Sequence, residues 1–260
     1  MVIRGGRPLE GTARLPAAKN SVLPLLAAAL LCKGESVLTQ VPRLSDVEQS
    51  VAILTALGCR CQWRGRGLAV DGAEAGGDGA LPEGPVRAMR SSVFYLAPAL
   101  HRCGRVQMPM PGGCKLGPRP IDIHLDGLVK MGARVQWQGE SLTVTAPGGL
   151  HGVDYSLRLP SVGATETLLM AAVLAPGQTV LRGAAAEPEI ADLAAFLTAC
   201  GARIRGAGTP LVQVEGVEAL TGATHTPIPD RIVAATLAAA VASAGGRVKL
   251  LGCPFEPLAP

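Results

Sequence analysis

A pattern of apolar runs, short strands and glycines recurs about every 70 residues, and a repeat of this kind restricts the fold of a chain strongly. Each copy has an Ala- and Leu-rich helical run, a short β-branched run after a Gly, and a second helical run that stops at another Gly. The first and third copies match best. They cover residues 25–31, 34–38 and 46–59, and residues 168–174, 177–181 and 189–202.

Each copy predicts the order helix, strand, helix, strand, strand, because alternating apolar residues follow the second helix. A looser second copy covers residues 94–100, 104–106 and 122–135. A single copy would expose the apolar face of its first helix. We therefore expect three copies to bury their first helices together around a pseudo-threefold axis, which gives an α/β globe with its sheets outside.

The repeat begins a fourth time near Pro229 and then breaks off, and the first stretch of the chain matches no part of it. We therefore expect residues 18–229 to form the three-repeat globe. Residues 1–17 and 230–260 would then be an incomplete part of a second globe. The Gly-rich tract 71–84 is predicted to be a surface loop.

Residues 111–120 read Pro-Gly-Gly-Cys-Lys-Leu-Gly-Pro-Arg-Pro, a composition that disfavours both helix and strand. Lys115 and Arg119 favour the thiolate form of Cys114, and Arg119 also offers a planar fork for phosphate. A small apolar Cys in a tight turn is the alternative. Because a core Cys seldom lies among so many glycines and prolines, we expect Cys114 to be a reactive thiol.

Alignment of the copies places four residue pairs at the starts of the first helices: Lys19 and Asn20, Met89 and Arg90, Val162 and Gly163, and Asp230 and Arg231. Helix N-termini present unpaired N–H groups and a positive dipole end, so they favour anions. Lys19 and Arg90 would add full charges, unless they are solvated surface cations. The small-residue turn 161–164 would let backbone N–H groups approach a phosphate.

Composition narrows the ligand class. The net charge is +4 without a basic run and aromatic residues make up 3%, so a small anionic ligand is favoured over nucleic acid.

The seven cysteines are dispersed, as in reduced proteins, which predicts a cytoplasmic location. Cys59 and Cys61 lack further ligands at metal-binding spacing. The apolar runs are too short to cross a membrane, and residues 1–5 do not resemble a signal segment.

Three further polar residues have open roles. His124 lies near a helix start with no assignable carboxylate partner, and we expect it to be a hydrogen-bonded structural residue. Glu187 and Glu189 begin the second helix of the third copy, where acidic residues interact favourably with the helix dipole. Either of them could instead bind a ligand.

Five segments together resemble one family, the UDP-N-acetylglucosamine 1-carboxyvinyltransferases, which are enolpyruvyl transferases that open peptidoglycan synthesis. They are residues 18–20, 89–91, 111–124, 161–165 and 229–231. The resemblance extends from end to end of the chain. The related enolpyruvylshikimate-phosphate synthases lack the loop of residues 111–120 with Cys114, which we call the cysteine loop. The resemblance therefore also distinguishes between members of the superfamily.

The resemblance implies an inside-out α/β barrel of βαβαββ-type repeats, here one near-complete globe plus a partial second. It implies transfer of an enolpyruvyl group from phosphoenolpyruvate to the 3′-hydroxyl of UDP-N-acetylglucosamine, by addition and then elimination of phosphate. No cofactor or metal is implied, and neither nucleic acid nor a membrane is an expected partner. The oligomeric state is not indicated.

The resemblance also implies roles for individual residues. Cys114 would be the catalytic proton donor to the phosphoenolpyruvate methylene. The residues expected to hold phosphoenolpyruvate are Lys19, Asn20 and Arg119. Those expected to bind the UDP-sugar are Arg90, Arg119, Pro120, Ile121, Asp122, Ile123, Leu159, Pro160, Ser161 and Val162, with Gly163 and Arg231 as further candidates.

Members of this family are longer than 260 residues. The carboxylate that deprotonates the sugar hydroxyl, and further arginines for phosphoenolpyruvate, are expected in the second globe. The expectation is therefore a fragment with weak or no activity alone. Two alternatives are a non-catalytic UDP-sugar-binding globe and an enolpyruvyl transferase with another acceptor. The cysteine loop argues against the second.

Overall fold

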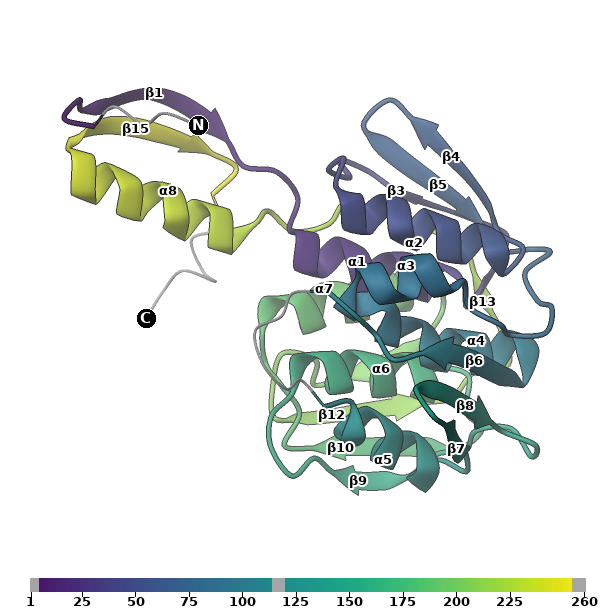
Figure 1. The fold of residues 1–260 in the computed structure, drawn as a ribbon. Helices are drawn as coiled ribbons and strands as arrows, with labels where there is room; N and C mark the ends of the chain where they lie inside the picture. The colour runs from purple at the N-terminus through teal and green to yellow at the C-terminus, as the bar shows by residue number, and fades with distance from the viewer. Residues whose placement is uncertain (1–4, 114–119, 254–260) are drawn as a thin grey trace.

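A computed structural model describes residues 5–113 and 120–253, and it confirms the predicted element order in all three copies (Figure 1). The first copy contains α1 (Lys19–Ala29), β3 (Glu35–Leu38), α2 (Ser45–Ala56), β4 (Arg60–Arg64) and β5 (Gly67–Asp71). The second contains η1 (Arg90–Tyr95), α4 (Leu96–Cys103), β6 (Arg105–Pro109), α5 (Asp122–Lys130), β7 (Arg134–Gln138) and β8 (Ser141–Thr145). The third contains α6 (Val162–Ala172), β10 (Gln178–Arg182), α7 (Pro188–Ala199), β11 (Arg203–Arg205) and β12 (Leu211–Glu215).

The second copy differs from the other two in detail. Its first helix starts as the 3₁₀ segment η1, and only Leu96–Cys103 is α-helical. The Gly-rich tract is irregular for most of its length, as expected, but the helix α3 (Glu83–Ala88) begins inside its last residues.

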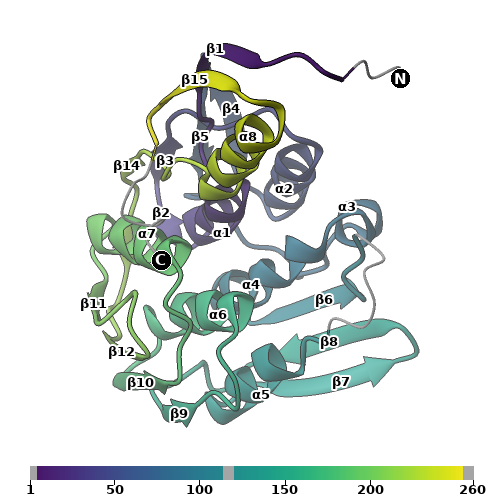
Figure 2. The same cartoon turned by 90° about the vertical axis from the view of Figure 1, so that its left-hand side faces the viewer.

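The first helices form the centre of the globe, a name we use for the elements from α1 to β14. Every residue from Ser21 to Ala29 in α1 and from Ala164 to Ala172 in α6 is buried. Figure 2 shows α1, α4 and α6 in the middle with the sheets around them. Each leucine buried there contributes about 1.5–3 kcal/mol, and the many alanines let the helices approach closely. The predicted placement of helices and sheets is confirmed.

Short parallel strands link the copies. The strand β9 (Asp154–Ser156) precedes α6 and pairs with β10. The strand β14 (Thr224–His225), at the end of the third copy, pairs with β3 of the first. Likewise β13 (Leu220–Thr221) pairs with β2 (Cys32–Lys33). The chain thus returns from its third copy to its first and closes the globe.

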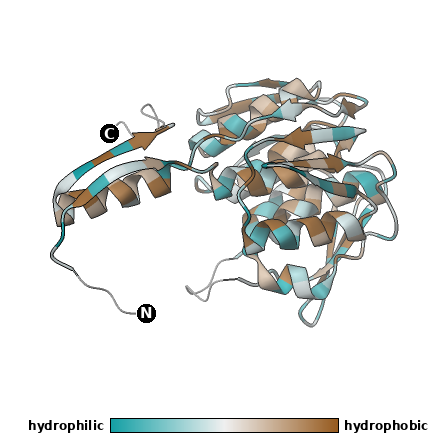
Figure 3. Cartoon of the chain, turned by 90° about the horizontal axis from the view of Figure 1, so that it is seen from above, coloured by the Kyte–Doolittle hydropathy of each residue, from teal (hydrophilic) through white to brown (hydrophobic). Residues whose placement is uncertain are grey.

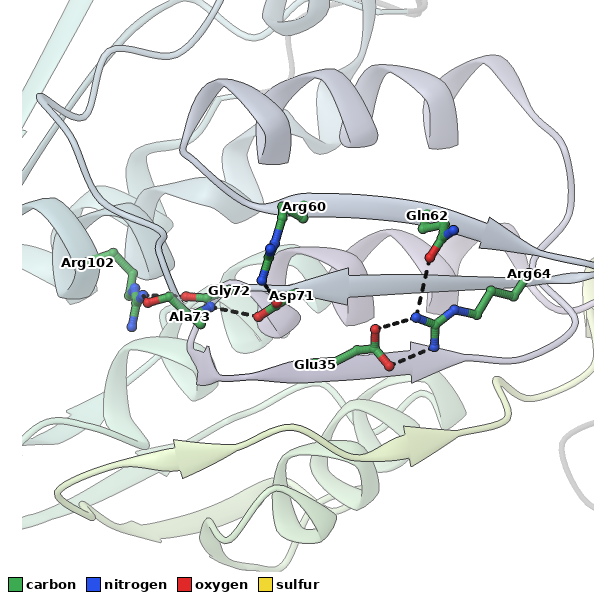
Figure 4. A network of polar contacts seen from close by, with 8 residues as sticks. All are labelled: Glu35, Arg60, Gln62, Arg64, Asp71, Gly72, Ala73 and Arg102. Atoms are coloured by element: carbon green, nitrogen blue, oxygen red, sulfur yellow. Dashed lines mark hydrogen bonds and ion pairs between the residues drawn. The ribbon is translucent and has the colours of Figure 1, made fainter.

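Ion pairs cover the outer face of the first sheet (Figure 4). Arg64 binds Glu35 across the sheet with two hydrogen bonds of 2.7 and 2.6 Å, and Arg60 binds Asp71 at 2.7 Å. These pairs are largely exposed, so each contributes about 0–1 kcal/mol. These ion pairs are therefore surface contacts that add little to the stability of the globe.

Three elements lie beside the globe and form what we call the arm (Figure 1). They are β1 (Leu9–Arg14), α8 (Arg231–Ala244) and β15 (Gly246–Leu251), and β1 pairs with β15 in parallel. Among the described residues of α8, only Ala234 is buried. Hydrophobic residues nevertheless dominate α8, the helix next to the two strands of the arm (Figure 3), and its sequence is rich in alanine like those of α1 and α6. A helix of core composition is therefore largely exposed in the arm.

Two chain segments connect the arm to the globe. They lie side by side, because Ala17 bridges Pro229, Ala18 N–H donates to the Ile228 carbonyl and Asp230 N–H donates to the Pro16 carbonyl. Next to this junction, buried Asp192 of α7 accepts hydrogen bonds from Ser21 of α1, from His225 of β14 and from the Ile228 N–H. One carboxylate therefore ties the segment from His225 to Ile228 to the helices α1 and α7.

Candidate functional site

A cavity of about 730 Å³ opens where the first helices begin. The N-terminal ends of α1, η1, α6 and α8 all contribute to its lining, together with the start of α5. The structure brings these sequence-predicted residues together on its wall: Lys19, Asn20, Arg90, Pro120, Asp122, Ile123, Leu159, Ser161, Val162, Gly163 and Arg231. The helix starts that the repeat makes equivalent thus lie around one cavity.

Among the described residues, two predicted site residues, Ile121 and Pro160, do not line this wall. Ile121 is 3% exposed, and it precedes the first turn of α5 as part of the core. Pro160 is exposed and lies beside Leu159. Cys114 and Arg119 lie outside the described residues. The described ends of their loop, Gly113 and Pro120, both line the cavity.

The cationic side chains of the wall are held by specific partners. Lys19 Nζ lies 2.9 Å from Asp46 Oδ2, and Arg90 Nη2 donates to the Pro120 carbonyl at 3.1 Å. Arg231 donates two hydrogen bonds, of 3.1 and 3.2 Å, to the buried carboxylate of Glu189. These contacts fix the positions of the cations around a space that suits an anionic ligand.

The N-terminus of α6 lies on the wall with Ser161, Val162 and Gly163 in its lining. Ser161 caps it by accepting a hydrogen bond from the Ala164 N–H at 3.4 Å. At Gly163 a Cβ atom would come within 3.1 Å of the His124 ring, so a glycine keeps this turn close to α5. Backbone N–H groups of such a turn can bind phosphate oxygens at short range.

His124 occupies a buried position behind that turn. Its Nδ1 is 2.9 Å from Thr167 Oγ1, and burial, together with the charge of Arg90, lowers its pKa to about 4. At neutral pH the imidazole is therefore uncharged. This agrees with the structural role expected from the sequence.

Sequence reasoning missed three charged residues of the wall. Asp46 positions Lys19, and Arg158 forms an ion pair with Asp122 that lowers the pKa of this carboxylate. The third is Glu166, a buried carboxyl on α6. A signal existed only for Glu166, because it is the one charged residue in the sequence of α6.

The described start of the cysteine loop is anchored to α3. Gly112 N–H donates to the Val86 carbonyl and Gly113 N–H to the Arg87 carbonyl, both at 3.2 Å. A Cβ on Gly112 would lie 1.7 Å from the Arg87 oxygen, so no larger residue fits without moving backbone. The glycine therefore fixes where the loop leaves the globe.

We expect Gly112→Ala to displace the loop and to lower the rate at which Cys114 is alkylated by at least about tenfold, while the globe stays folded. Timed alkylation with peptide mapping measures the rate, and circular dichroism checks the fold. Gly148→Ala is the matched control, because nothing lies within 4 Å of its added Cβ. Equal rates in the two variants would contradict the anchoring role.

The EPSP synthase (3-phosphoshikimate 1-carboxyvinyltransferase) family matches residues 3–259. The chain belongs to this family. Within the EPSP synthase family it is 46% identical to UDP-N-acetylglucosamine 1-carboxyvinyltransferase 1 of Symbiobacterium thermophilum, over 96% of this chain and 58% of the relative. It is 45% identical to the UDP-N-acetylglucosamine 1-carboxyvinyltransferase of Desulfovibrio desulfuricans, over 99% of this chain and 61% of that relative. The chain thus spans about three fifths of the length of these relatives.

The fold agrees with membership of the EPSP synthase family. The enolpyruvyl transferase NikO of Streptomyces tendae superposes with a TM-score of 0.84 over 95% of this chain and 59% of that protein, at 22% identity. At this identity the likeness concerns the fold alone. It supports the inside-out arrangement of βαβαββ-type repeats predicted from the sequence.

The described residues show no sign of two other kinds of site. Residues 5–113 and 120–253 contain no cluster of three or more His, Cys, Asp or Glu side chains arranged to bind a metal ion. In the same ranges, the helices are too short or too polar to extend across a lipid bilayer.

Proposed function

We propose that this chain contributes to enolpyruvyl transfer from phosphoenolpyruvate to the 3′-hydroxyl of UDP-N-acetylglucosamine, the first committed step of peptidoglycan synthesis, in the cytoplasm. The acceptor is inferred from relatives at 45–46% identity that carry this activity in their names. The observation that carries the proposal is the convergence of Lys19, Arg90 and the α6 N-terminus on one cavity.

In this proposal the anionic parts of both substrates lie against Lys19, Arg90 and the N-terminus of α6. Lys19, Asn20 and Arg119 hold phosphoenolpyruvate, Arg90 holds the sugar nucleotide through its phosphate groups, and Leu159 to Val162 hold the diphosphate. The segment from Arg119 to Ile123 contacts the uridine side. Gly163 and Arg231 extend this surface. Cations around phosphate and carboxylate also stabilise the charge that develops during addition.

The chemical steps then follow from the proton donor. In its thiol form Cys114 gives its proton to the methylene carbon of phosphoenolpyruvate and becomes a thiolate, which Lys115 and Arg119 stabilise, while the sugar oxygen bonds to the adjacent carbon and a tetrahedral intermediate forms. Loss of a proton from the resulting methyl group and departure of phosphate restore the double bond as the enol ether. By the resemblance, the base for the sugar hydroxyl comes from the part of the relatives that this chain does not match.

We also propose the division of the chain that the repeat predicts. Residues 18–229 would be one globe, while residues 1–17 and 230–260 would belong to a second body. The exposed, apolar α8 supports this division, because its composition suits the centre of a globe.

We expect the 260-residue chain to bind UDP-N-acetylglucosamine weakly, with an affinity that falls as salt is added. Arg90→Ala should reduce the affinity about tenfold or more, because a charge-assisted contact to phosphate is lost. Isothermal titration calorimetry at low salt measures both effects.

Arg60→Ala provides the matched control for this binding experiment. Arg60 forms an exposed ion pair with Asp71 on the outer sheet, and it takes no part in the cavity wall. Its loss should leave the affinity unchanged. Absence of binding at millimolar nucleotide in low salt, or equal loss in the two variants, would contradict the proposed site.

A further inference from the structure

Glu166 carries a buried polar atom at the cavity that has no partner in the described part of the chain. The residue is 1% exposed, it lines the cavity, and its Oε1 has no hydrogen-bond partner there. Its two neighbours on α6 are both engaged. Thr165 Oγ1 accepts from the Ala185 N–H at 3.0 Å, and Thr167 Oγ1 contacts His124. Buried polar atoms in folded proteins are usually satisfied, so this exception requires an explanation.

The repeat shows that packing does not demand a carboxyl at this position. The alignment that pairs Val162 with the starts of the other first helices also pairs Glu166 with Leu23, Val93 and Ala234. All three equivalents are buried and apolar, and Leu23 and Val93 line the same cavity. An apolar side chain thus fits the equivalent place in every other copy. A carboxyl costs more to bury, so its presence points to a ligand.

The surroundings of Glu166 favour its neutral form. Burial raises its pKa well above the ordinary value, and the charges of Glu189 and Glu187 raise it further. The nearby cation Arg231 is engaged by Glu189, to which it donates two hydrogen bonds. A protonated carboxyl offers one O–H donor and retains acceptor capacity, which matches a hydroxyl or an amide. An anionic group would instead be repelled by the two neighbouring glutamates.

We propose that Glu166 binds an uncharged polar group of the ligand, a hydroxyl or the acetamide of the sugar, and so helps to select the sugar part of the nucleotide. This inference rests on the proposed function. It divides the cavity by charge: Lys19 and Arg90 receive the anionic groups, and Glu166 receives a neutral one. Glu166 is therefore a specificity-determining residue that is separate from the phosphate contacts.

The test compares two variants with two ligands by calorimetry on the 260-residue chain. Glu166→Leu places at this position the residue that α1 carries there, so the variant should fold. It should bind UDP-N-acetylglucosamine about tenfold more weakly than the wild type and bind UDP equally well. Glu166→Gln retains a donor and an acceptor, and its affinity for the sugar nucleotide should stay within about threefold of the wild type.

The outcomes separate this inference from the proposed function. Unchanged affinity of Glu166→Leu for UDP-N-acetylglucosamine, with normal binding of UDP, would overturn the role of Glu166 alone. Equal losses for both ligands would also overturn it, because the effect would then be structural. Failure of the wild-type chain to bind either ligand would overturn the proposed function and this inference together. Thermal unfolding of each variant confirms that a folded protein was measured.

Discussion

An epoxide phosphonate of the fosfomycin type should alkylate Cys114 selectively, and Cys114→Ser should abolish that adduct. The phosphonate resembles the phosphate of phosphoenolpyruvate, and Lys115 and Arg119 would hold it beside the thiolate. Attack of the sulfur on the epoxide carbon opens the ring, forms a thioether and leaves an alcohol after proton uptake. Peptide mapping by mass spectrometry after a timed reaction identifies the modified cysteine. We expect nearly all of the early adduct at this position.

The described cysteines are poor competitors for this reagent. Burial raises the pKa of Cys59 to about 12 and that of Cys61 to about 11, so neither forms a thiolate near neutral pH. A hydrogen bond with Cys32 and burial also raise the pKa of Cys200, and Cys32 is fully buried. Cys253 is partly exposed, which makes Cys253→Ser the matched control. Adducts spread evenly over several cysteines would show that the loop does not activate its thiol.

Asp192→Ala should lower the free energy of unfolding by about 3–5 kcal/mol, which corresponds to a drop of about 10 °C in the melting temperature. The carboxylate is 6% exposed and accepts hydrogen bonds from Ser21, His225 and the Ile228 N–H. Alanine would leave these buried donors unsatisfied at the point where the globe closes. Urea unfolding followed by circular dichroism measures the change.

Glu215→Ala serves as the control for this stability experiment. Glu215 forms an ion pair with Arg203 at 2.7 Å, but both side chains are more than 60% exposed. Its loss should cost about 0–1 kcal/mol. A stability of Asp192→Ala close to that of this surface variant would mean that the buried carboxylate does not hold the junction.

The sequence predicted those helices and strands that are long enough to show a recognisable hydrophobic periodicity. The apolar run of residues 168–174 falls mostly within α6, and the run of residues 25–31 mostly within α1. The strands β9 and β14 were not predicted, because two or three residues carry no measurable alternation. Their position depends on parallel pairing with strands of other copies. Such pairing is a property of the closed globe and not of the local sequence.

The site was predictable to the extent that it follows the repeat. Lys19 and Arg90 stand at equivalent helix starts in the sequence, which predicts that they lie together, and both line the cavity. Arg158 was missed because its place is defined by Asp122, which lies 36 residues away. Glu166 has a signal in the same alignment, since its equivalents one turn into the other first helices are apolar. This difference between the copies is the observation on which the proposed ligand contact of Glu166 rests.

The side-by-side segments at Ala17 and Pro229 have a consequence for how the arm forms. The strands β1 and β15 lie at opposite ends of the sequence, and bringing such distant segments together normally costs substantial loop-closure entropy. A closed globe already holds both of its ends at one point, so the effective loop between the two strands shrinks to α8 and the few residues that flank the junction. For the kinetics of folding, the globe then takes the place of a turn in a parallel β–α–β unit. The first strand of this unit, β1, lies more than two hundred residues before its second strand, β15, in the sequence.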